Sequence, residues 1–263
     1  MSVMKSAVRI AKDIFHSLGL EISRYRPETH APEENPLGTS YLSDIKRLTR
    51  SHPVVVFDVG ANKGQSVIKF KNLLRDCEIH SFEPGPETYK ILLENAGALR
   101  GVHLNNVAVG SSCTSKTFFE NKYSDMSSFL KPGEICWGEV VGETEVPVIT
   151  LDGYCADKNI SHISVLKTDT QGYDFEVLKG AEGLLKNNRI ELLLLEVIFS
   201  ELYENLPQFD EVYRFLMDRG FKLVSFYQFG YHEQIAAGSD ALFINTSFDY
   251  GGTNSSNTPP VHK

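Results

Sequence analysis

A glycine-containing turn that follows an apolar run is the feature that most constrains the fold of this chain. Residues 54–59 read Val-Val-Val-Phe-Asp-Val, and such a run is typical of a strand covered on both faces. Gly60 and Gly64 follow, and a helical pattern begins at Gln65. Glycine lets the backbone turn sharply and approach a ligand closely, and the N–H groups at a helix start would face that ligand. The stretch therefore predicts a ligand-binding turn between a strand and a helix.

An acidic residue at the end of the next predicted strand indicates the kind of ligand. Residues 79–83 form that strand, and it ends in Glu83, 19 residues after Gly64. A carboxylate in this position binds the ribose hydroxyls of an adenosine-containing cofactor. The glycines are spaced Gly-x-x-x-Gly, which differs from the dinucleotide-binding fingerprint. Asp58, the glycine turn and Glu83 together predict a nucleoside cofactor.

Strand and helix patterns alternate along most of the chain, which predicts an α/β fold. Strands are expected at residues 54–59, 79–83, 102–109, 163–169, 190–197, 221–229 and 241–245. Helices are expected at 41–49, 65–74, 86–96 and 209–219, and one helix after residue 169 places Val177, Leu178, Ala181, Leu184 and Leu185 on one face. The last two strands have no helix between them, so an antiparallel pair is expected. The prediction is a mostly parallel seven-stranded sheet with a terminal antiparallel hairpin and helices on both faces.

The predicted domain occupies residues 40–246, between an N-terminal helix and linker at 1–39 and a disordered tail at 247–263. Residues 111–150 interrupt the alternation and are expected to cover the substrate. Residues 3–18 form a basic amphipathic pattern. Such a helix packs on its own domain, touches a membrane surface or contacts a second subunit. The last alternative would make the protein a homo-oligomer.

Composition excludes several classes of protein. The net charge is −8 and the pI is near 5.5, which argues against a nucleic-acid partner. The four cysteines show no Cys-x-x-Cys spacing, so mostly buried, free thiols and no zinc site are expected. No apolar run reaches the roughly 18 residues of a spanning helix, and a signal-peptide core is missing. The expectation is a soluble, cytoplasmic protein without an integral membrane span.

Several motifs then resemble a known family. They are Asp58-Val59-Gly60-Ala61-Asn62-Lys63-Gly64, Phe82-Glu83-Pro84, Asn106-Val107-Ala108-Val109-Gly110, Thr150-Leu151-Asp152, and Leu166-Lys167-Thr168-Asp169-Thr170-Gln171-Gly172-Tyr173 leading into Val177-Leu178-Lys179-Gly180-Ala181. From about residue 40 to 246 the chain resembles the FkbM family of S-adenosylmethionine-dependent methyltransferases. The resemblance implies a Rossmann-like class I methyltransferase fold, S-adenosylmethionine as cofactor, and O-methylation of a hydroxyl on a sugar, glycan or polyketide-type product. Asp-Thr-Gln-Gly replaces the commoner Asp-Val-Glu-Gly, so Gln171 cannot supply a carboxylate.

In a methyltransferase of this kind, Asp58 and the turn from Gly60 to Gly64 would hold the methionine portion of the cofactor. Glu83 would bind the ribose diol, and Asn106 and Val107 would contact the adenine. A turn-capping role for Asn106 is the alternative. The predicted cofactor-binding residues are Asp58, Gly60, Ala61, Asn62, Gly64, Glu83, Pro84, Asn106, Val107 and Asp169.

An alcohol acceptor needs a base to remove its proton. Asp169 is the leading candidate, because the C-terminal ends of parallel strands open onto the ligand crevice. Glu196, at the end of the fifth strand, is the second, and His232, in the terminal hairpin loop, is the third. Lys167 shares a strand face with Asp169 and would pair with it or orient the substrate. Asp169 with Glu196 as a divalent-metal site is a minor alternative, and no metal ligand is predicted.

Three other functions are weighed. A nicotinamide-dependent oxidoreductase lacks support, because the third glycine and a Tyr-x-x-x-Lys pair are missing. A non-catalytic binding or assembly module with the same fold is disfavoured by the presence of both Asp58 and Glu83. Nucleic-acid methylation is disfavoured by the acidic charge and by the absence of an Asn-Pro-Pro-Tyr segment. A small-molecule or glycan acceptor with a free hydroxyl remains the favoured partner.

Overall fold

The computed structural model describes residues 36–250. The predicted N-terminal helix at 3–18 and most of the predicted tail lie outside the described residues. The main elements are α2 (Tyr41–Leu48), β1 (Val55–Val59), α3 (Gln65–Leu73), β2 (Glu78–Phe82), α4 (Pro86–Ala96), β3 (Val102–Asn105), α5 (Leu151–Lys158), β7 (Ile163–Thr168), α6 (Asp174–Lys179), α7 (Glu182–Lys186), β8 (Ile190–Ile198), α8 (Phe209–Met217), β9 (Phe221–His232) and β10 (Ile235–Asn245). The remaining strands, β4, β5 and β6, belong to a second sheet.

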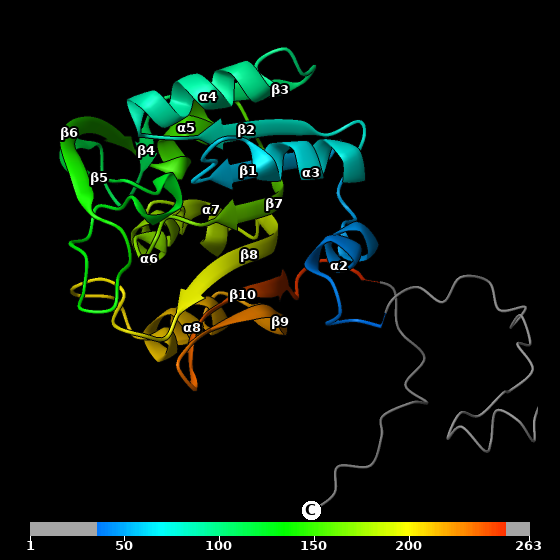
Figure 1. Ribbon diagram of the computed structural model, residues 1–263. Helices are drawn as coiled ribbons and strands as arrows, with labels where there is room; N and C mark the ends of the chain where they lie inside the picture. Colours follow the sequence, from blue (N-terminus) through cyan, green and yellow to red (C-terminus); the bar gives the residue numbers. More distant parts are fainter. Residues whose placement is uncertain (1–35, 251–263) are drawn as a thin grey trace, which may run out of the picture. The chain divides into compact units, whose positions relative to one another are not determined.

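The principal sheet has seven strands in the order β3-β2-β1-β7-β8-β10-β9 (Figure 1). The five strands from β3 to β8 are parallel to their neighbours, and β10 is antiparallel to both β8 and β9. The predicted mostly parallel sheet with a terminal antiparallel hairpin is therefore confirmed. The chain order reverses between β1 and β7, and ligands bind at the carboxyl ends of strands at such a point.

Two hydrophobic clusters cover the two faces of the sheet. Phe57 of β1 packs in the cluster that contains residues of α5, α6, α7 and α8. Its neighbour Val56 packs in the cluster that contains residues of α2, α3 and α4. Successive side chains of a strand point to opposite faces, which explains why every residue of β1 is buried. The predicted helices on both faces are confirmed.

A second, three-stranded sheet in the order β4-β6-β5 contains β4 (Ala108–Val109), β5 (Thr114–Asn121) and β6 (Val140–Ile149). The prediction of one strand over 102–109 is therefore wrong. The chain leaves the main sheet after β3, where the Asn106 Nδ2 donates to the carbonyl oxygens of Glu83 and Pro84. A short 3-10 helix, η1 (Ser124–Met126), follows β5.

Two other predicted elements differ from the structure. The single helix expected after β7 is divided into α6 and α7 at Gly180, where a Cβ would lie 2.0 Å from the carbonyl oxygen of Gly110. The last two strands are longer than predicted, so His232 ends β9 and does not lie in a long loop. The outer part of this hairpin is exposed, and an exposed strand has no buried face to produce alternation.

The cysteines agree with the prediction in part. All four are free thiols, but only Cys77 and Cys155 are buried; Cys113 is exposed and Cys136 is partly exposed. Among residues 36–250, no helix is long and apolar enough to cross a bilayer.

Candidate active site

A cavity lies at the carboxyl ends of β1, β2 and β7, with about 600 Å³ of empty space that includes solvent at its open mouth. Its walls come from the ends of these three strands, from the segment after β3, and from the segment around η1. The lining residues are Val59, Gly60, Asn62, Phe82, Glu83, Pro84, Val107, Ala108, Val109, Phe118, Ser124, Asp125, Ser127, Phe129, Asp169, Thr170, Gln171 and Tyr173.

The glycine turn after β1 joins the ends of the three strands. Gly60 has φ +80°, and a Cβ at this position would lie 1.9 Å from the carbonyl oxygen of Asp169. The N–H groups of Gly60 and Ala61 both donate to the carbonyl oxygen of Phe82. A side chain at residue 60 would therefore be incompatible with both the φ angle and the space available. The turn is built so that the backbone itself forms part of the cavity wall.

Glu83 presents a buried carboxylate to this cavity. Its Oε2 accepts the N–H of Asn62 and its Oε1 accepts the N–H of Gly85, each at 2.9 Å. A carboxylate has about four lone-pair sites, so each oxygen keeps capacity for one further donor. Burial, assisted by the nearby Asp58 charge, raises the pKa of Glu83 to about 7 against the opposing effect of the two N–H donors.

Lys167 lies between two carboxylates beside the turn. Its Nζ is 3.3 Å from Asp58 Oδ1 and 3.3 Å from Asp169 Oδ2. Asp58 is fully buried, and its Oδ2 accepts the hydroxyl of Ser66 at 2.5 Å. Burial alone would lower the pKa of Lys167, but Asp169 and Asp58 outweigh it and raise that pKa. Lys167 is therefore a permanent cation at neutral pH and holds the two acidic groups together.

The side chain of Gln171 links Asp169 to a further carboxyl group, that of Glu196. The Gln171 Nε2 donates to Asp169 Oδ1 at 3.2 Å and to Glu196 Oε2 at 2.9 Å. The hydroxyl of Tyr203 donates to Gln171 Oε1 at 2.9 Å. Gln171 has φ +55°, a conformation that non-glycine residues rarely adopt. The amide therefore separates two carboxylates that would otherwise repel each other.

The two carboxyl groups have pKa values displaced in opposite directions. Burial would raise the pKa of Asp169, but Lys167 and the hydrogen bond from Gln171 outweigh it, so this pKa lies below its usual range. Burial and the charges of Asp169, Asp174 and Asp240 raise the pKa of Glu196 well above its usual range. Such opposed shifts in neighbouring carboxyl groups are common in acid–base sites.

Comparison with known proteins identifies the family. The model of the Methyltransferase FkbM domain matches residues 58–223, which is more than half of the chain. The chain belongs to the FkbM methyltransferase family. The matched range contains the glycine turn, Glu83, Lys167, Asp169, Gln171 and Glu196.

Individual relatives of this FkbM-family methyltransferase are distant. The 2-O-methyltransferase NoeI of Sinorhizobium fredii (strain NBRC 101917 / NGR234) is 26% identical over an alignment of 192 residues, and the match covers 65% of this chain and 78% of NoeI. Among solved structures, an rRNA methylase from Streptococcus thermophilus has a TM-score of 0.44 and 13% identity, covering 77% of this chain and 92% of that one. TrmK of M. capricolum, solved with S-adenosyl-homocysteine, has a TM-score of 0.45 and 9% identity, covering 78% and 68%.

The structure places the predicted cofactor residues at different depths in this FkbM-family site. Gly60, Asn62, Glu83, Pro84, Val107 and Asp169 line the cavity. Asp58, Ala61 and Gly64 do not line it. Asp58 therefore reaches the cavity through Lys167 and Asp169. Asn106 ties together the backbone after β2 through the two hydrogen bonds described above, which is the capping role left open by the sequence.

The structure brings three of the four predicted catalytic residues together and leaves the fourth apart. Lys167, Asp169 and Glu196 come together through ion pairs and the Gln171 amide. His232 is exposed at the tip of the β9–β10 hairpin and does not line the cavity. Gln171 and Tyr203 are the site residues that the sequence interpretation missed. The departure from the usual motif at residue 171 was the available signal for Gln171, whereas Tyr203 lies in no recognised motif.

The segment at 111–150, which the sequence predicts as a substrate cover, forms one wall of the cavity. The hydroxyl of Ser124 donates to Asn62 Oδ1 at 2.9 Å, and the hydroxyl of Ser128 donates to the carbonyl oxygen of Gln171 at 2.7 Å. The wall is therefore bonded both to the glycine turn and to the loop after β7. Its Phe118 and Phe129 rings add apolar surface to the cavity.

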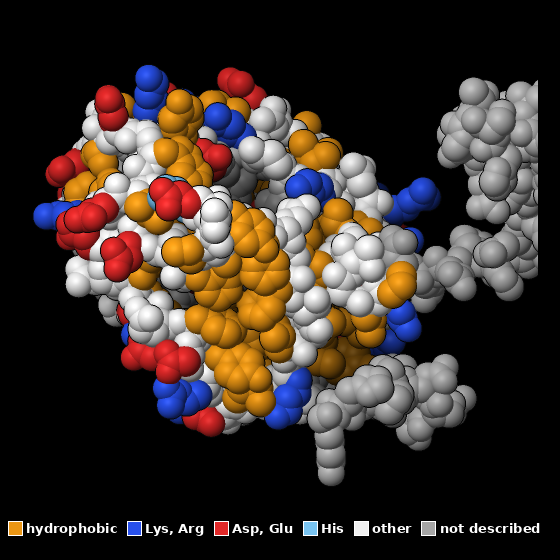
Figure 2. Space-filling model, turned by 60° about the horizontal axis from the view of Figure 1, so that its bottom comes forward, with side chains coloured by type: hydrophobic (Ala, Val, Ile, Leu, Met, Phe, Trp, Pro, Cys, Tyr) orange, Lys and Arg blue, Asp and Glu red, His pale blue; other side chains and the backbone are white. Residues whose placement is uncertain are grey.

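An aromatic patch, defined here as Phe199, Phe209, Phe226, Phe229 and Tyr231, lies on the side of the hairpin and α8. Figure 2 shows a broad apolar area on this side of the molecule. Exposed apolar patches of this kind mark interaction surfaces. Phe209 of this patch also lines a smaller cavity that reaches Glu196. Phe209, the first residue of α8, therefore belongs both to the aromatic patch and to a cavity that Glu196 lines.

Proposed function

We propose that this chain is an S-adenosylmethionine-dependent O-methyltransferase that acts on a hydroxyl group of a sugar, glycan or polyketide-type acceptor. The observation that carries the proposal is one cavity that contains both the buried Glu83 carboxylate and the Asp169 carboxylate. The first is suited to a nucleoside diol, and the second to the proton of an acceptor hydroxyl.

The cofactor end of the cavity fits the nucleoside portion of S-adenosylmethionine. Each Glu83 oxygen has one backbone donor and spare capacity for one ribose hydroxyl. The Gly60 turn lines the cavity, and its φ angle and the nearby Asp169 carbonyl oxygen leave no space for a side chain there. Val107 and the ring of Phe82 provide apolar wall for an adenine. When bound, the cofactor supplies an electrophilic methyl group, and the protein contributes position and electrostatics.

The acceptor end contains the groups that handle the proton. The cofactor would supply the methyl group and keep the S–C bonding electrons as a thioether leaving group, so the acceptor hydroxyl would have to give its proton to a residue of the protein. Asp169 lines the cavity and stays ionised because of Lys167 and Gln171, so it accepts a hydrogen bond from the hydroxyl and then its proton. Glu196, which the Gln171 amide links to Asp169, is the alternative base. A positioned base of this kind contributes roughly 10²–10⁴-fold.

The acceptor class is supported by a relative and by the absence of strong positive charge. NoeI carries the name of a 2-O-methyltransferase, which supports oxygen as the methylated atom. The net charge of −8 makes a polyanionic acceptor unfavourable. A neutral hydroxylated compound agrees with both observations.

The experiment that tests this function is a calorimetric titration with S-adenosylmethionine, followed by methyl transfer to a panel of hydroxylated acceptors. Saturable binding that is lost in Glu83→Ala and kept in Glu87→Ala is expected, because Glu87 is an exposed glutamate on α4. Methyl groups should appear on oxygen in the product. A folded protein that does not bind S-adenosylmethionine would contradict the proposal and favour a non-catalytic binding module.

A further inference from the structure

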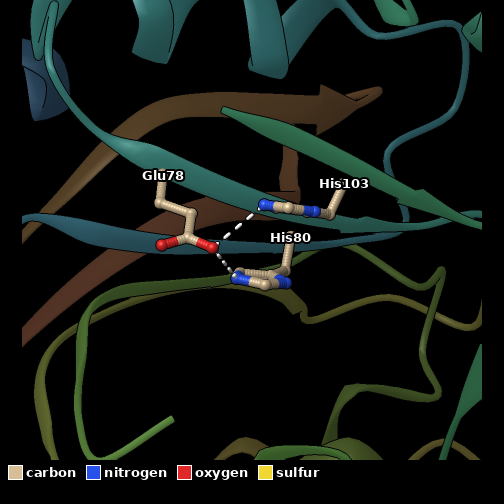
Figure 3. Close-up of side chains that lie close together, drawn as sticks. All are labelled: Glu78, His80 and His103. Atoms are coloured by element: carbon tan, nitrogen blue, oxygen red, sulfur yellow. Dashed lines mark ion pairs between the residues drawn. The ribbon is translucent and has the colours of Figure 1, made fainter. Parts of the chain in front are cut away.

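A cluster of three metal-binding side chains lies on the sheet away from the cofactor cavity. Glu78 and His80 are on β2, and His103 is on the neighbouring edge strand β3, where it pairs in register with His80. The three side chains project from the same face and converge (Figure 3). Glu83 lies five residues beyond Glu78 along β2, which corresponds to roughly 16 Å of extended chain.

The donor atoms of the cluster are spaced as ligands of one ion would be. Glu78 Oε1 is 2.9 Å from His103 Nε2 and 3.3 Å from His80 Nε2, and all three atoms lie within 4.8 Å of one another. A tetrahedral zinc ion with bonds of about 2.0–2.1 Å separates neighbouring ligand atoms by about 3.3 Å. The two carboxylate–imidazole separations are therefore close to the spacing of zinc ligands.

The buried histidine directs its Nε2 atom into the cluster. His80 is 3% exposed, and its Nε2 lies 3.3 Å from Glu78 Oε1 without the geometry of a hydrogen bond. A buried polar atom that is only loosely paired is costly.

The other ring nitrogen of His80, Nδ1, has a hydrogen-bond partner. This atom lies 2.9 Å from the hydroxyl of Tyr154 on α5. Histidine ligands of metals commonly have such a partner, which fixes the tautomer and the ring orientation. In the tautomer in which Nδ1–H donates to the Tyr154 oxygen, Nε2 carries the lone pair that a metal would bind. The His80 and His103 rings are stacked, with centroids 4.6 Å apart and an interplanar angle of 13°, so the exposed His103 ring has to turn for both Nε2 lone pairs to meet at one ion.

The charge around the cluster is close to balanced. Glu78 adds one negative charge, and the Lys158 ammonium near His80 opposes it in part. Lys158 is exposed at the end of α5, so solvent screens its effect. The side chains of Glu78 and His103 are about half exposed, at 48% and 51%, which leaves room for a water molecule as the fourth ligand.

We propose that Glu78, His80 and His103 bind a divalent transition-metal ion, Zn²⁺ or one of similar ligand preference, which clamps the edge strand β3 to β2. Two imidazoles and one carboxylate are a ligand set that such ions accept. An edge strand has a neighbour on one side only. A metal ion bound by side chains of both β2 and β3 would therefore stabilise β3, the strand at this edge. The sequence did not reveal the site, because its ligands are brought together by strand register and not by motif spacing.

The test is a zinc titration of the full chain after treatment with a chelator, by calorimetry and thermal unfolding. We expect saturable binding near one ion per chain and a rise in the unfolding temperature. His103→Ala and Glu78→Gln should each weaken binding by at least about tenfold, since loss of even an outer partner costs 10–100-fold. His232→Ala is the matched control, because this histidine is exposed on another strand; its zinc affinity should equal that of the unsubstituted chain.

Two further measurements distinguish this site from metal binding elsewhere on the chain. Cobalt(II) should give the ligand-field absorption of a four-coordinate nitrogen and oxygen site, and hydrogen exchange of residues 102–105 should slow on zinc addition. A thiolate-to-cobalt charge-transfer band would assign the ion to a cysteine and overturn the proposal. Absence of saturable binding, or equal binding by the His103→Ala chain, would also overturn it and leave the cluster as a hydrogen-bonded carboxylate–imidazole pair. None of these results depends on methyl transfer, because the experiment uses no cofactor and no acceptor.

Discussion

The two ends of the cavity, which we propose hold the cofactor and the acceptor, are built on different principles. The cofactor end depends on backbone: the φ angle of Gly60, the N–H groups that bind Glu83, and the close approach of the Asp169 carbonyl oxygen. The acceptor end depends on side chains from separate segments, with Gln171 bonded to Asp169, Glu196 and Tyr203. Backbone requirements restrict which residue can occupy a position, whereas a side-chain network can be rebuilt from other residues. The first kind of site is therefore easier to recognise in a sequence.

The largest expected effect tests the acceptor end. Asp169→Asn removes the charge of the candidate base while keeping its shape, so we expect turnover to fall by roughly 10²–10⁴-fold. The measurement is the steady-state rate of methyl transfer with a substrate found in the acceptor screen. Asp157→Asn, at an exposed position of α5, should leave the rate unchanged. A larger loss in Glu196→Gln than in Asp169→Asn would move the role of base to Glu196.

The next effect tests the backbone character of the cofactor end. Gly60→Ala should lower the free energy of unfolding by at least about 3 kcal/mol, because a side chain there meets both a strained φ angle and a carbonyl oxygen. Urea unfolding measures the change. Gly142→Ala is the control, since the nearest atom to its new Cβ is 3.8 Å away. Similar losses in the two variants would show that the turn is not specially constrained.

A third prediction concerns the amide at the centre of the acceptor end. Gln171→Glu places a third carboxyl group between Asp169 and Glu196, so we expect a loss of about 1–3 kcal/mol in stability. The loss should grow as pH rises, because the added group repels its neighbours most when all are ionised. Urea unfolding at several pH values measures it, with Gln234→Glu in the exposed hairpin turn as control. Unchanged stability at pH 8 would mean that the amide does not hold the carboxyl groups apart.

The smallest effect follows from the raised pKa of Glu83, which is about 7. Ribose hydroxyls donate to the ionised carboxylate, and this form is lost as pH falls through 7. The affinity for S-adenosylmethionine should therefore increase by up to about tenfold between pH 6 and pH 8. Titrations across this range should show the trend, and Glu83→Gln should remove it. A slope that persists in the variant would assign the pH dependence to the cofactor itself or to another group.

The contrast between backbone requirements and side-chain networks also explains which features could be predicted from the sequence. The buried strand at 55–59, the turn and Glu83 were predictable, because local pattern and glycine positions determine them. The division of residues 102–109 between two sheets was not predictable, since it depends on an Asn106 side chain that bonds to the backbone after β2. The contacts of Gln171, Tyr203 and His80 also required the fold, because their partners are distant in sequence.

The measurement that tests the central claim most directly is a crystal structure of the protein with S-adenosylhomocysteine. The account predicts that the adenosine lies in the cavity after β1 and β2, with both ribose hydroxyls within hydrogen-bond distance of the Glu83 carboxylate and the amino-acid portion next to Gly60. A ligand bound elsewhere, or bound in this cavity without contact to Glu83, would contradict it.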